Sequence, residues 1–259
     1  MSNYSFPVLD FNSKSESMQT IKIYAQLLSE IKRHFTPPQK YKDEQTLQIY
    51  AKGYTTSTIP VIAGGKVETL DLNLNFLEHQ LKIFCGKARL SVDLQNKSIM
   101  SFNNELCLLL NGLSVNCHFI SSKFSNNRQL YYNPSVILDY WKVINQVYFI
   151  MLHFKSGILN ETSCIYFDPE KLSLGLLLFT GKIIDGKESK NWLDSQENIS
   201  IEFSTGNEIY CDPFFSVSCN SENENTFYLS YEEFRNKENP NLYIINFFNS
   251  KLPQTIKRI

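Results

Sequence analysis

The chain has 259 residues, of which 42% are hydrophobic and 20% are charged, and its formal net charge is −1. This composition is ordinary for a soluble globular protein, and the length is enough for a substantial core in one large domain or two fused halves. The near-neutral charge, without a long basic block, argues against a nucleic-acid partner. No apolar run reaches the roughly 18 residues of a membrane-spanning helix, so we expect no membrane association.

The cysteines and the amino-terminal residues bear on the cellular compartment. The six cysteines form no C-x-x-C pair and show no zinc-type spacing with histidine: Cys85, Cys107, Cys117, Cys164, Cys211 and Cys219. The first residues lack the basic and then apolar pattern of a secretory signal. We therefore expect reduced thiols in a cytoplasmic protein that holds neither a metal nor a cofactor.

Residues 133–157 predict the clearest element, which is one long helix. Asn133 is suited to cap the free N–H groups of the first turn, and Pro134 fits the first helical position. Gly157 is suited to the left-handed residue that follows the last turn. Apolar residues cover most of the circumference of this helix, which is typical of a helix buried between other elements.

The chain before this helix begins with a polar segment, residues 1–17, which predicts an extended arm. Four apolar residues are expected to hold the arm to the body: Phe6, Val8, Leu9 and Phe11. Apolar residues at helical spacing then predict a helix over 18–35, which ends before Pro37 because proline lacks a backbone donor.

Short or alternating apolar runs predict strands in two groups. The first group has strands at 46–54, 69–76, 81–84, 88–94 and 117–123, turns at Gly64-Gly65 and Gly86, a bend at Gly53 and a helix over 101–112. The second group has strands at 163–167, 172–179, 199–204, 214–219, 226–230 and 242–248, a turn at Asp168-Pro169 and a short helix over 231–236. The polar residues 182–197 predict an exposed loop that is held by Trp192.

Strands that occur in runs favour an α+β fold, with mostly antiparallel sheets packed with the long central helix and two shorter helices. We expect an arm over 1–17 and a single domain over 18–259. A helix followed by a run of strands occurs twice, so two similar halves, 18–130 and 131–259, are a further interpretation. The Gly-rich turns of a dinucleotide-binding fold are absent.

The sequence carries none of the common catalytic motifs, so no catalytic residue is assigned. His34 and His153 lie near helix carboxyl ends, where an imidazolium is stabilised by the helix dipole, and this favours a structural role. His79 lies in a predicted turn beside Glu78, which would raise the pKa of the imidazole. We consider His79 both as a base or ligand and as a structural residue.

Two segments gather polar side chains that could bind a ligand. Lys52 and the hydroxyls of Thr55, Thr56 and Ser57 follow a strand, and such a segment can bind an anion or can serve as a plain strand edge. Glu202 and Ser204 would share one face of a strand, because side chains alternate, and an acid beside a hydroxyl can orient a ligand. A serine and a glutamate without a histidine make a poor nucleophilic system.

Several segments in order resemble an uncharacterised bacterial family, domain of unknown function 5996. The segments that carry the resemblance are Tyr24-Ala25-Gln26, Thr36-Pro37-Pro38, residues 49–60, residues 75–81, Tyr132-Asn133-Pro134 with Tyr140-Trp141, residues 178–181, and Glu202 with Ser204. The threonine-rich part of residues 49–60 is the most specific of them. The resemblance covers about residues 6–235 and implies no established activity.

The departures from the family pattern bear on catalysis. The resemblance implies a His- and Trp-rich run where this chain has 39–44, a His-containing run where it has 166–170, and a His where it has Ile201. If those histidines serve a metal or proton-transfer site in relatives, this chain has lost most of it.

Two hypotheses follow from these observations. The first is a non-catalytic module that binds a small molecule or a protein partner through Lys52, Thr55, Thr56, Ser57, His79, Glu202 and Ser204. The alternative is a hydrolase or transferase that uses Glu202 and Ser204 with Lys52 and His79, which requires these groups to converge in one cleft.

Overall fold

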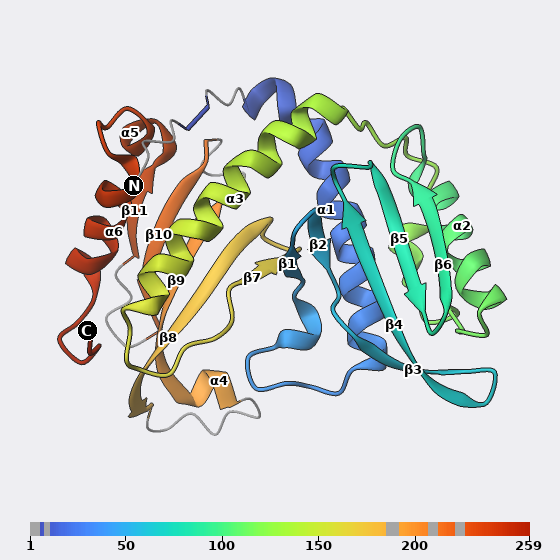
Figure 1. Cartoon of the computed structure of the whole chain (residues 1–259), viewed down its shortest axis with the longest axis horizontal. Coiled ribbons are helices and arrows are strands. Elements are labelled where there is room, and N and C mark those ends of the chain that lie inside the picture. The colour runs from blue at the N-terminus through green and yellow to red at the C-terminus, as the bar shows by residue number, and fades with distance from the viewer. Residues whose placement is uncertain (1–5, 8–10, 185–191, 207–211, 221–225) are drawn as a thin grey trace. The chain divides into compact units, whose positions relative to one another are not determined.

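The computed structural model describes residues 6–7, 11–184, 192–206, 212–220 and 226–259 (Figure 1). The chain divides into two compact units. Unit 1 comprises Met1–Phe11, Lys142–Tyr166 and Lys171–Ile259, and unit 2 comprises Asn12–Trp141 and Phe167–Glu170. The predicted division into an arm and one domain, with or without two related halves, stays a prediction.

The helices and strands alternate in runs along the chain. The helices are α1 (Phe11–Phe35), α2 (Ile99–Gly112), α3 (Pro134–Ser156), α4 (Trp192–Ser195), α5 (Tyr231–Arg235) and α6 (Pro240–Lys251), with 3-10 turns η1 (Asp43–Gln45) and η2 (Ser122–Phe124). The strands are β1 (Gln48–Tyr50), β2 (Gly53–Thr55), β3 (Ile59–Ala63), β4 (Lys66–Asn75), β5 (Gln80–Cys85), β6 (Ala88–Asp93), β7 (Tyr166–Asp168), β8 (Ser173–Ile183), β9 (Gln196–Ser204), β10 (Phe214–Cys219) and β11 (Thr226–Ser230). The predicted α+β class is confirmed.

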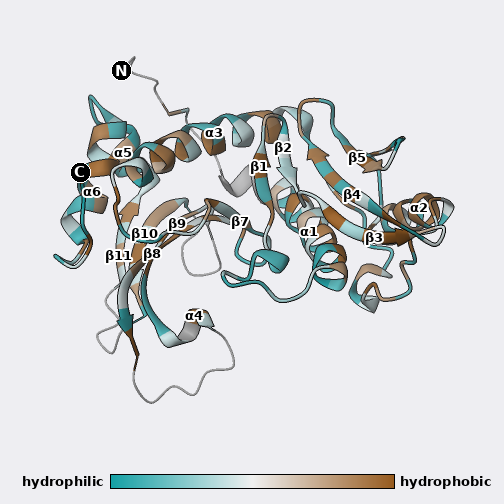
Figure 2. Ribbon diagram, turned by 60° about the horizontal axis from the view of Figure 1, so that its bottom comes forward, coloured by the Kyte–Doolittle hydropathy of each residue, from teal (hydrophilic) through white to brown (hydrophobic). Residues whose placement is uncertain are grey.

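Unit 2 contains a sheet in the order β1-β2-β4-β5-β6, with β3 paired to β4 and all pairs antiparallel. Leu70, Leu72 and Leu74 of β4 are fully buried on one face. Helices α1 and α2 cover this face (Figures 1 and 2), and Tyr24 of α1 lies 4.1 Å from Phe102 of α2 between ring centres. The strict alternation of β4 therefore places its leucines in the core of unit 2.

Unit 1 contains strands β8 to β11 of the second sheet, in the order β11-β10-β9-β8. The pairs from β8 to β11 are antiparallel. Ile201 of β9 and Phe215 of β10 are fully buried, and Phe215 lies 5.2 Å from Phe248 of α6 between ring centres. Phe6 packs against Tyr231 and Phe234 of this unit, so the predicted attachment of the amino-terminal segment through Phe6 is confirmed. Val8 and Leu9 lie outside the described residues.

The long helix is present as α3, and brown, apolar residues recur along it in Figure 2. The Asn133 side chain accepts hydrogen bonds from the N–H groups of Ser135 and Val136, at 3.0 and 3.4 Å, which confirms the predicted cap. The prediction for Gly157 is wrong, because this glycine does not adopt a positive φ. Its N–H bonds to the Phe154 carbonyl instead, at 3.1 Å.

Five predicted elements differ in the structure. Helix α1 begins at Phe11 rather than at residue 18. Its first turns could not be predicted from apolar periodicity because they are polar. At 25 residues, α1 is also not shorter than α3. Residues 46–54 form two strands, β1 and β2, joined by a turn rather than one bent strand. The predicted loop over 182–197 contains α4 and the start of β9, and its residues 185–191 lie outside the described part.

The two remaining differences have local causes. Residues 117–123 form turns instead of a strand, because the Asn116 side chain accepts from the His118 N–H and the Ser121 hydroxyl caps η2. Residues 242–248 belong to α6, which starts with Asn239 as its cap and Pro240 at its first turn. This is the same Asn-Pro start as in α3.

Candidate functional site

The threonine-rich segment enters the sheet of unit 2 at Gly53, which has φ 155°. A Cβ at this position would lie 1.9 Å from the carbonyl oxygen of Leu74 in β4. No side chain fits there without a backbone shift, so the close approach of β2 to β4 requires glycine.

The hydroxyls that follow Gly53 are engaged by the chain itself. Thr55 Oγ1 donates to Asp71 Oδ1 at 2.6 Å and accepts from the N–H of Ser57 at 2.8 Å. Thr56 Oγ1 accepts from the N–H of Leu72 at 3.0 Å, and Thr56 is fully buried. These bonds support the strand-edge interpretation, since they stabilise the pairing with β4. Anion binding by this segment stays a prediction.

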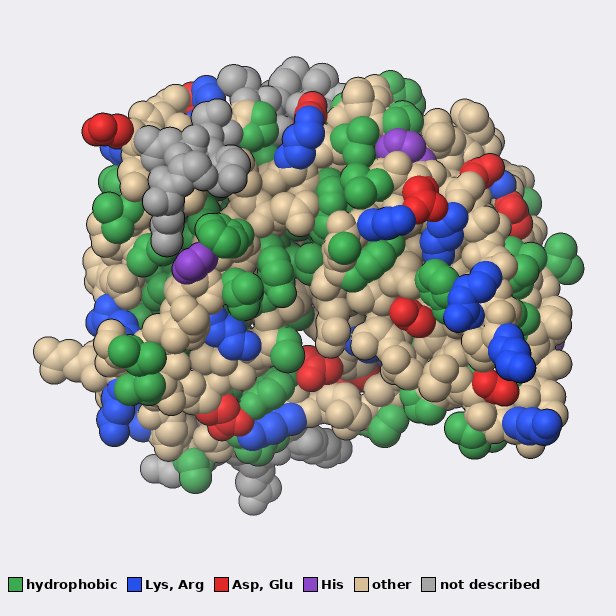
Figure 3. Space-filling view, in the orientation of Figure 1, with side chains coloured by type: hydrophobic (Ala, Val, Ile, Leu, Met, Phe, Trp, Pro, Cys, Tyr) green, Lys and Arg blue, Asp and Glu red, His purple; other side chains and the backbone are tan. Residues whose placement is uncertain are grey.

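Lys52 forms an ion cluster on the surface of the same unit. Its Nζ lies 2.5 Å from Glu78 Oε1, and Lys82 Nζ lies 2.9 Å from Glu78 Oε2. Hydrogen bonds from Lys52 first, and then from Lys82, lower the pKa of the Glu78 carboxyl to about 2. Figure 3 shows basic and acidic side chains interspersed over the side that carries β4–β6. The cluster is a mixed-charge surface rather than a basic patch.

His79 occupies a left-handed position, with φ 55°, in the turn between β4 and β5. Its Nδ1 lies 3.1 Å from the Tyr132 hydroxyl. Partial burial lowers the pKa of the imidazole, because desolvation disfavours the charged form. The expected rise caused by Glu78 is therefore wrong, since the Glu78 carboxylate is bound to Lys52 and Lys82.

Several of the residues that carry the family resemblance, among them Tyr54, Phe76, Tyr140 and Trp141, meet in the interior of unit 2. Tyr54 is fully buried and stacks on Phe167, with ring centres 3.9 Å apart. Its hydroxyl lies 2.5 Å from the Tyr140 hydroxyl, and Phe76 and Trp141 contact the Tyr54 ring edge-on. Burial raises the pKa of both tyrosines, so the pair stays protonated and acts as a buried hydrogen bond.

Glu202 and Ser204 lie on one face of β9 in unit 1, opposite to that of the buried Ile201. Glu202 Oε1 accepts from Lys171 Nζ at 2.8 Å and from the Ser200 hydroxyl at 3.0 Å. The Ser204 hydroxyl accepts from the N–H of Gly206 at 3.3 Å. The acid is thus held by a lysine and a serine of its own unit.

Gly175 of β8 pairs with Glu202 of β9. A Cβ on Gly175 would lie 2.4 Å from the ring of Tyr166. The Tyr166 ring therefore lies directly over the backbone of Gly175.

The seven predicted binding residues divide between the units. Five of them belong to unit 2, and Glu202 and Ser204 belong to unit 1. Within unit 2, Lys52 forms an ion pair with Glu78, and His79 is the residue that follows Glu78 in the chain. The predicted joint binding role of all seven stays a prediction.

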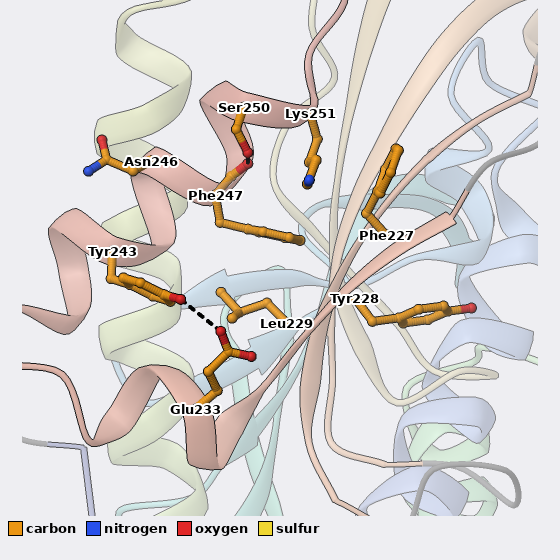
Figure 4. Close-up of a pocket in the computed structure, with 9 residues that line it drawn as sticks. All are labelled: Phe227, Tyr228, Leu229, Glu233, Tyr243, Asn246, Phe247, Ser250 and Lys251. Carbon is orange, nitrogen blue, oxygen red and sulfur yellow. Dashed lines mark hydrogen bonds between the residues drawn. The ribbon is translucent and has the colours of Figure 1, made fainter.

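A groove that sequence reasoning missed lies in unit 1, between β11 and α6, and a residue of α5 closes one end (Figure 4). It has a volume of about 410 Å³ and nine lining residues: Phe227, Tyr228, Leu229, Glu233, Tyr243, Asn246, Phe247, Ser250 and Lys251. Phe227 and Tyr228 are 38% and 49% exposed, whereas Leu229 is buried. Leu229 thus forms an apolar floor and Phe227 an exposed wall, whereas the Tyr228 side chain points away from α6 (Figure 4).

The two ends of the groove differ in charge. Lys251 Nζ lies 4.7 Å from the centre of the Phe227 ring and 6.0 Å from that of Phe247, and Figure 4 shows the ammonium between the two rings. At the other end, the Tyr243 hydroxyl donates to Glu233 Oε1 at 2.7 Å, which raises the pKa of Tyr243. One end therefore presents a cation, and the other presents a hydrogen-bonded acid.

Signals for this groove were present in the sequence. Phe227 and Tyr228 are adjacent, so one of the two aromatic side chains must leave the core face of a strand. Asn239 and Pro240 mark the start of the helix that forms the second wall. Because residues 242–248 were predicted to form a strand, the helical wall of the groove was not predicted.

The described residues contain no group of three or more His, Cys, Asp or Glu side chains placed to hold a metal ion. Five cysteines are free thiols, and Cys211 lies outside the described residues. In this part of the chain no helix combines the length and apolar character needed to cross a membrane.

The model of a family of unknown function, DUF5996, matches residues 6–217. The chain belongs to this family. Comparisons with curated proteins and with solved structures found no significant match. The matched residues include the Tyr54 interior, Glu202 and Ser204, whereas the groove residues, from 227 to 251, follow the end of the match.

Proposed function

We propose that this DUF5996 protein is a non-catalytic interaction module that binds an extended polypeptide segment in the groove between β11 and α6. The observation that carries the proposal is an edge strand with two exposed aromatic residues beside an open groove. Strand β11 ends the order of its sheet and, among the described residues, pairs only with β10.

Edge strands are normally protected against pairing by charge, proline or a covering segment. Strand β11 instead carries Phe227 and Tyr228 with large exposed fractions. An extended peptide that adds to such an edge gains backbone hydrogen bonds, while neighbouring pockets select its side chains. The wall formed by Tyr243 and Phe247 of α6 provides that selection here.

The charge at the open end indicates the chemistry of the peptide. The Lys251 ammonium lies between Phe227 and Phe247 and is suited to pair with a carboxylate. The aromatic walls favour a large apolar side chain next to that acid. We therefore expect the bound segment to contain an acidic residue close to an aromatic or branched aliphatic one.

A displayed library of random peptides of about ten residues, near the upper end of usual strand lengths, tests this proposal on the purified full chain. We expect enrichment of peptides with the acidic and apolar pair. Phe227→Ser should weaken the enriched peptides at least about tenfold, which corresponds to about 1.4 kcal/mol. Lys251→Glu should weaken acidic peptides and favour basic ones.

Lys66→Glu and Val67→Ser are the matched controls, because both residues are exposed in the β3–β4 hairpin of unit 2. They should leave the affinity unchanged. In an added strand, every second backbone N–H of the peptide bonds to β11 and the others point away from it. N-methylation of the first set should therefore abolish binding, and N-methylation of the second set should not. Selected peptides that bind Phe227→Ser and the unaltered protein equally would contradict the proposal.

Within each unit, the contacts of the predicted residues support binding over catalysis. The Ser204 hydroxyl accepts from a backbone N–H, and the Lys52 ammonium is paired with Glu78. A hydrolase or transferase based on Glu202 and Ser204 would need a base at the serine, and the described contacts of Ser204 include none. The free thiols support our proposal of a cytoplasmic location.

A further inference from the structure

A second cavity lies in unit 1, where the carboxyl end of α3, one face of α6 and the last residues of the chain meet. Its volume of about 430 Å³ falls within the range of roughly 300–1,000 Å³ that is typical of small-molecule sites. No described residue that lines it is acidic, and none of them lines the groove between β11 and α6. The main polar and apolar lining residues are His153, Asn249 and Arg258, and Phe154, Ile158 and Ile245.

Pairing between two segments that are far apart in the sequence builds this cavity. The last residues of the chain run antiparallel to the segment that follows α3, and the two lie side by side in Figure 1. The Leu159 N–H donates to the Lys257 carbonyl at 3.0 Å. The Ile259 N–H donates to the Gly157 carbonyl, also at 3.0 Å. These bonds hold the backbone on both sides of Arg258, so this residue is fixed beside the end of α3.

Asn249 of α6 orients the Arg258 side chain. Arg258 Nη1 donates to Asn249 Oδ1 at 2.8 Å, and both residues line the cavity. In the described part of the chain, no residue accepts a hydrogen bond from Nε or Nη2 of Arg258. These two nitrogens form one edge of the planar guanidinium, and such an edge matches the two oxygens of a carboxylate. The bond to Asn249 therefore leaves a pair of donors for a ligand.

The end of α3 would normally oppose an anion, because the last carbonyls of a helix carry partial negative charge. Here two of these carbonyls are bonded to donors of the same turn. The Ser156 hydroxyl donates to the His153 carbonyl at 2.7 Å, and the Gly157 N–H donates to the Phe154 carbonyl at 3.1 Å. The His153 imidazole, which lies edge-on to Phe149, also lines the cavity. This turn therefore adds a ring N–H donor to the cavity wall.

We propose that this cavity binds a small carboxylic acid with an apolar body, whose carboxylate pairs with the Arg258 guanidinium. The apolar wall of Phe154, Ile158 and Ile245 receives the body of the ligand. The single permanent cation of the cavity matches the single charge of a carboxylate, whereas a phosphate monoester carries a charge of about −1.5 to −2. The cavity and the groove share no lining residue, so either proposal can fail alone.

Isothermal titration calorimetry of the purified full chain with sodium phenylacetate tests the proposal. We expect phenylacetate to bind with a dissociation constant at or below about 1 mM, a modest affinity for a ligand of this size. Phenylacetamide has nearly the same shape without the charge, so it should bind at least about tenfold more weakly. Phenyl phosphate should also bind more weakly than phenylacetate. The proposal is overturned if phenylacetate does not bind, or if either comparison compound binds as tightly.

Arg258→Gln removes the cation and should weaken phenylacetate binding at least about tenfold. Lys257→Gln is the matched control, because it removes the same charge from the neighbouring residue, which is not among the residues that line the cavity. It should leave the affinity unchanged. Both residues are exposed, so both variants should fold, and thermal unfolding checks this. If Lys251→Glu removes phenylacetate binding and Arg258→Gln does not, the acid lies in the groove and the proposal is overturned.

Discussion

The aromatic residues of unit 2 and those of the groove in unit 1 are used in opposite ways. The Tyr54 and Tyr140 hydroxyls are buried and bonded to each other, whereas Phe227 and Tyr228 are exposed on the edge strand β11. The first pair lies within the residues matched by the family, and the second lies after them. The buried tyrosine pair therefore stabilises the interior of unit 2, whereas the groove that we propose as a binding surface lies outside the matched residues.

The largest effect that would test this contrast is expected from Gly53→Ala. The added Cβ would meet the Leu74 carbonyl oxygen at 1.9 Å, at a φ that side chains rarely adopt, so the pairing of β2 with β4 must distort. We expect a loss of about 3 kcal/mol in the free energy of unfolding. Urea unfolding followed by Trp141 fluorescence measures it, in a Trp192→Phe background that leaves one tryptophan.

Gly112→Ala is the control for this substitution, because a Cβ at Gly112 would have no neighbour within 4 Å and its φ is not positive. It should leave the stability unchanged or raise it slightly. If Gly53→Ala costs no more than Gly112→Ala and instead removes ligand binding, the threonine-rich segment is a site after all.

The next effect is expected from the buried tyrosine pair. Tyr54→Phe removes one hydroxyl and leaves that of Tyr140 buried without its partner, which should cost about 1–3 kcal/mol. Tyr140→Phe should cost a similar amount. The double substitution should cost clearly less than the sum, because no polar group is then left unpaired. Additive costs would show that the hydroxyls do not depend on each other.

Much of the fold could be predicted because its signals are local. The alternation of Leu70, Leu72 and Leu74 fixed both the strand and its buried face, since side chains alternate across a sheet. Asn133 and Pro134 fixed the start of α3. These signals act through neighbouring residues, so they need no knowledge of the tertiary structure.

The candidate site was harder to predict because exposure depends on which elements pack together. The run from Leu242 to Phe248 reads as a strand, yet Ile244 and Phe248 are buried one helical turn apart. The Thr55 and Thr56 hydroxyls looked available from sequence, but their partners Asp71 and Leu72 come from a strand that only the pairing of β2 with β4 brings close.

A smaller effect is expected from Gly175→Ala in unit 1. The Cβ would meet the Tyr166 ring at 2.4 Å, and an aromatic side chain can swing away where a paired backbone cannot. We therefore expect a cost of about 1 kcal/mol, well below that of Gly53→Ala. Thermal unfolding of both variants compares the two directly. Equal costs would mean that Tyr166 is held as rigidly as the backbone of β4.

The smallest effect concerns pH and His79. Partial burial lowers the pKa of the folded imidazole, so the unfolded chain binds a proton first as the pH falls below about 6.5. The contribution of the neutral imidazole is therefore complete above this pH and declines below it. His79→Asn should remove this decline, since asparagine tolerates the left-handed φ of 55° and any loss from the missing bond to Tyr132 should be equal at pH 8 and pH 5.

Because His79 is only partly buried, the decline should be well under about 1 kcal/mol. Urea unfolding at pH 8 and pH 5 measures it, with His118→Asn as the control because His118 is exposed. The Glu78 cluster does not enter this range, since its carboxyl keeps its charge until the pH approaches 2. A rise in stability from pH 8 to pH 5 that depends on His79 would instead reveal an acid bound to the imidazole, and would restore His79 as a candidate ligand-binding residue.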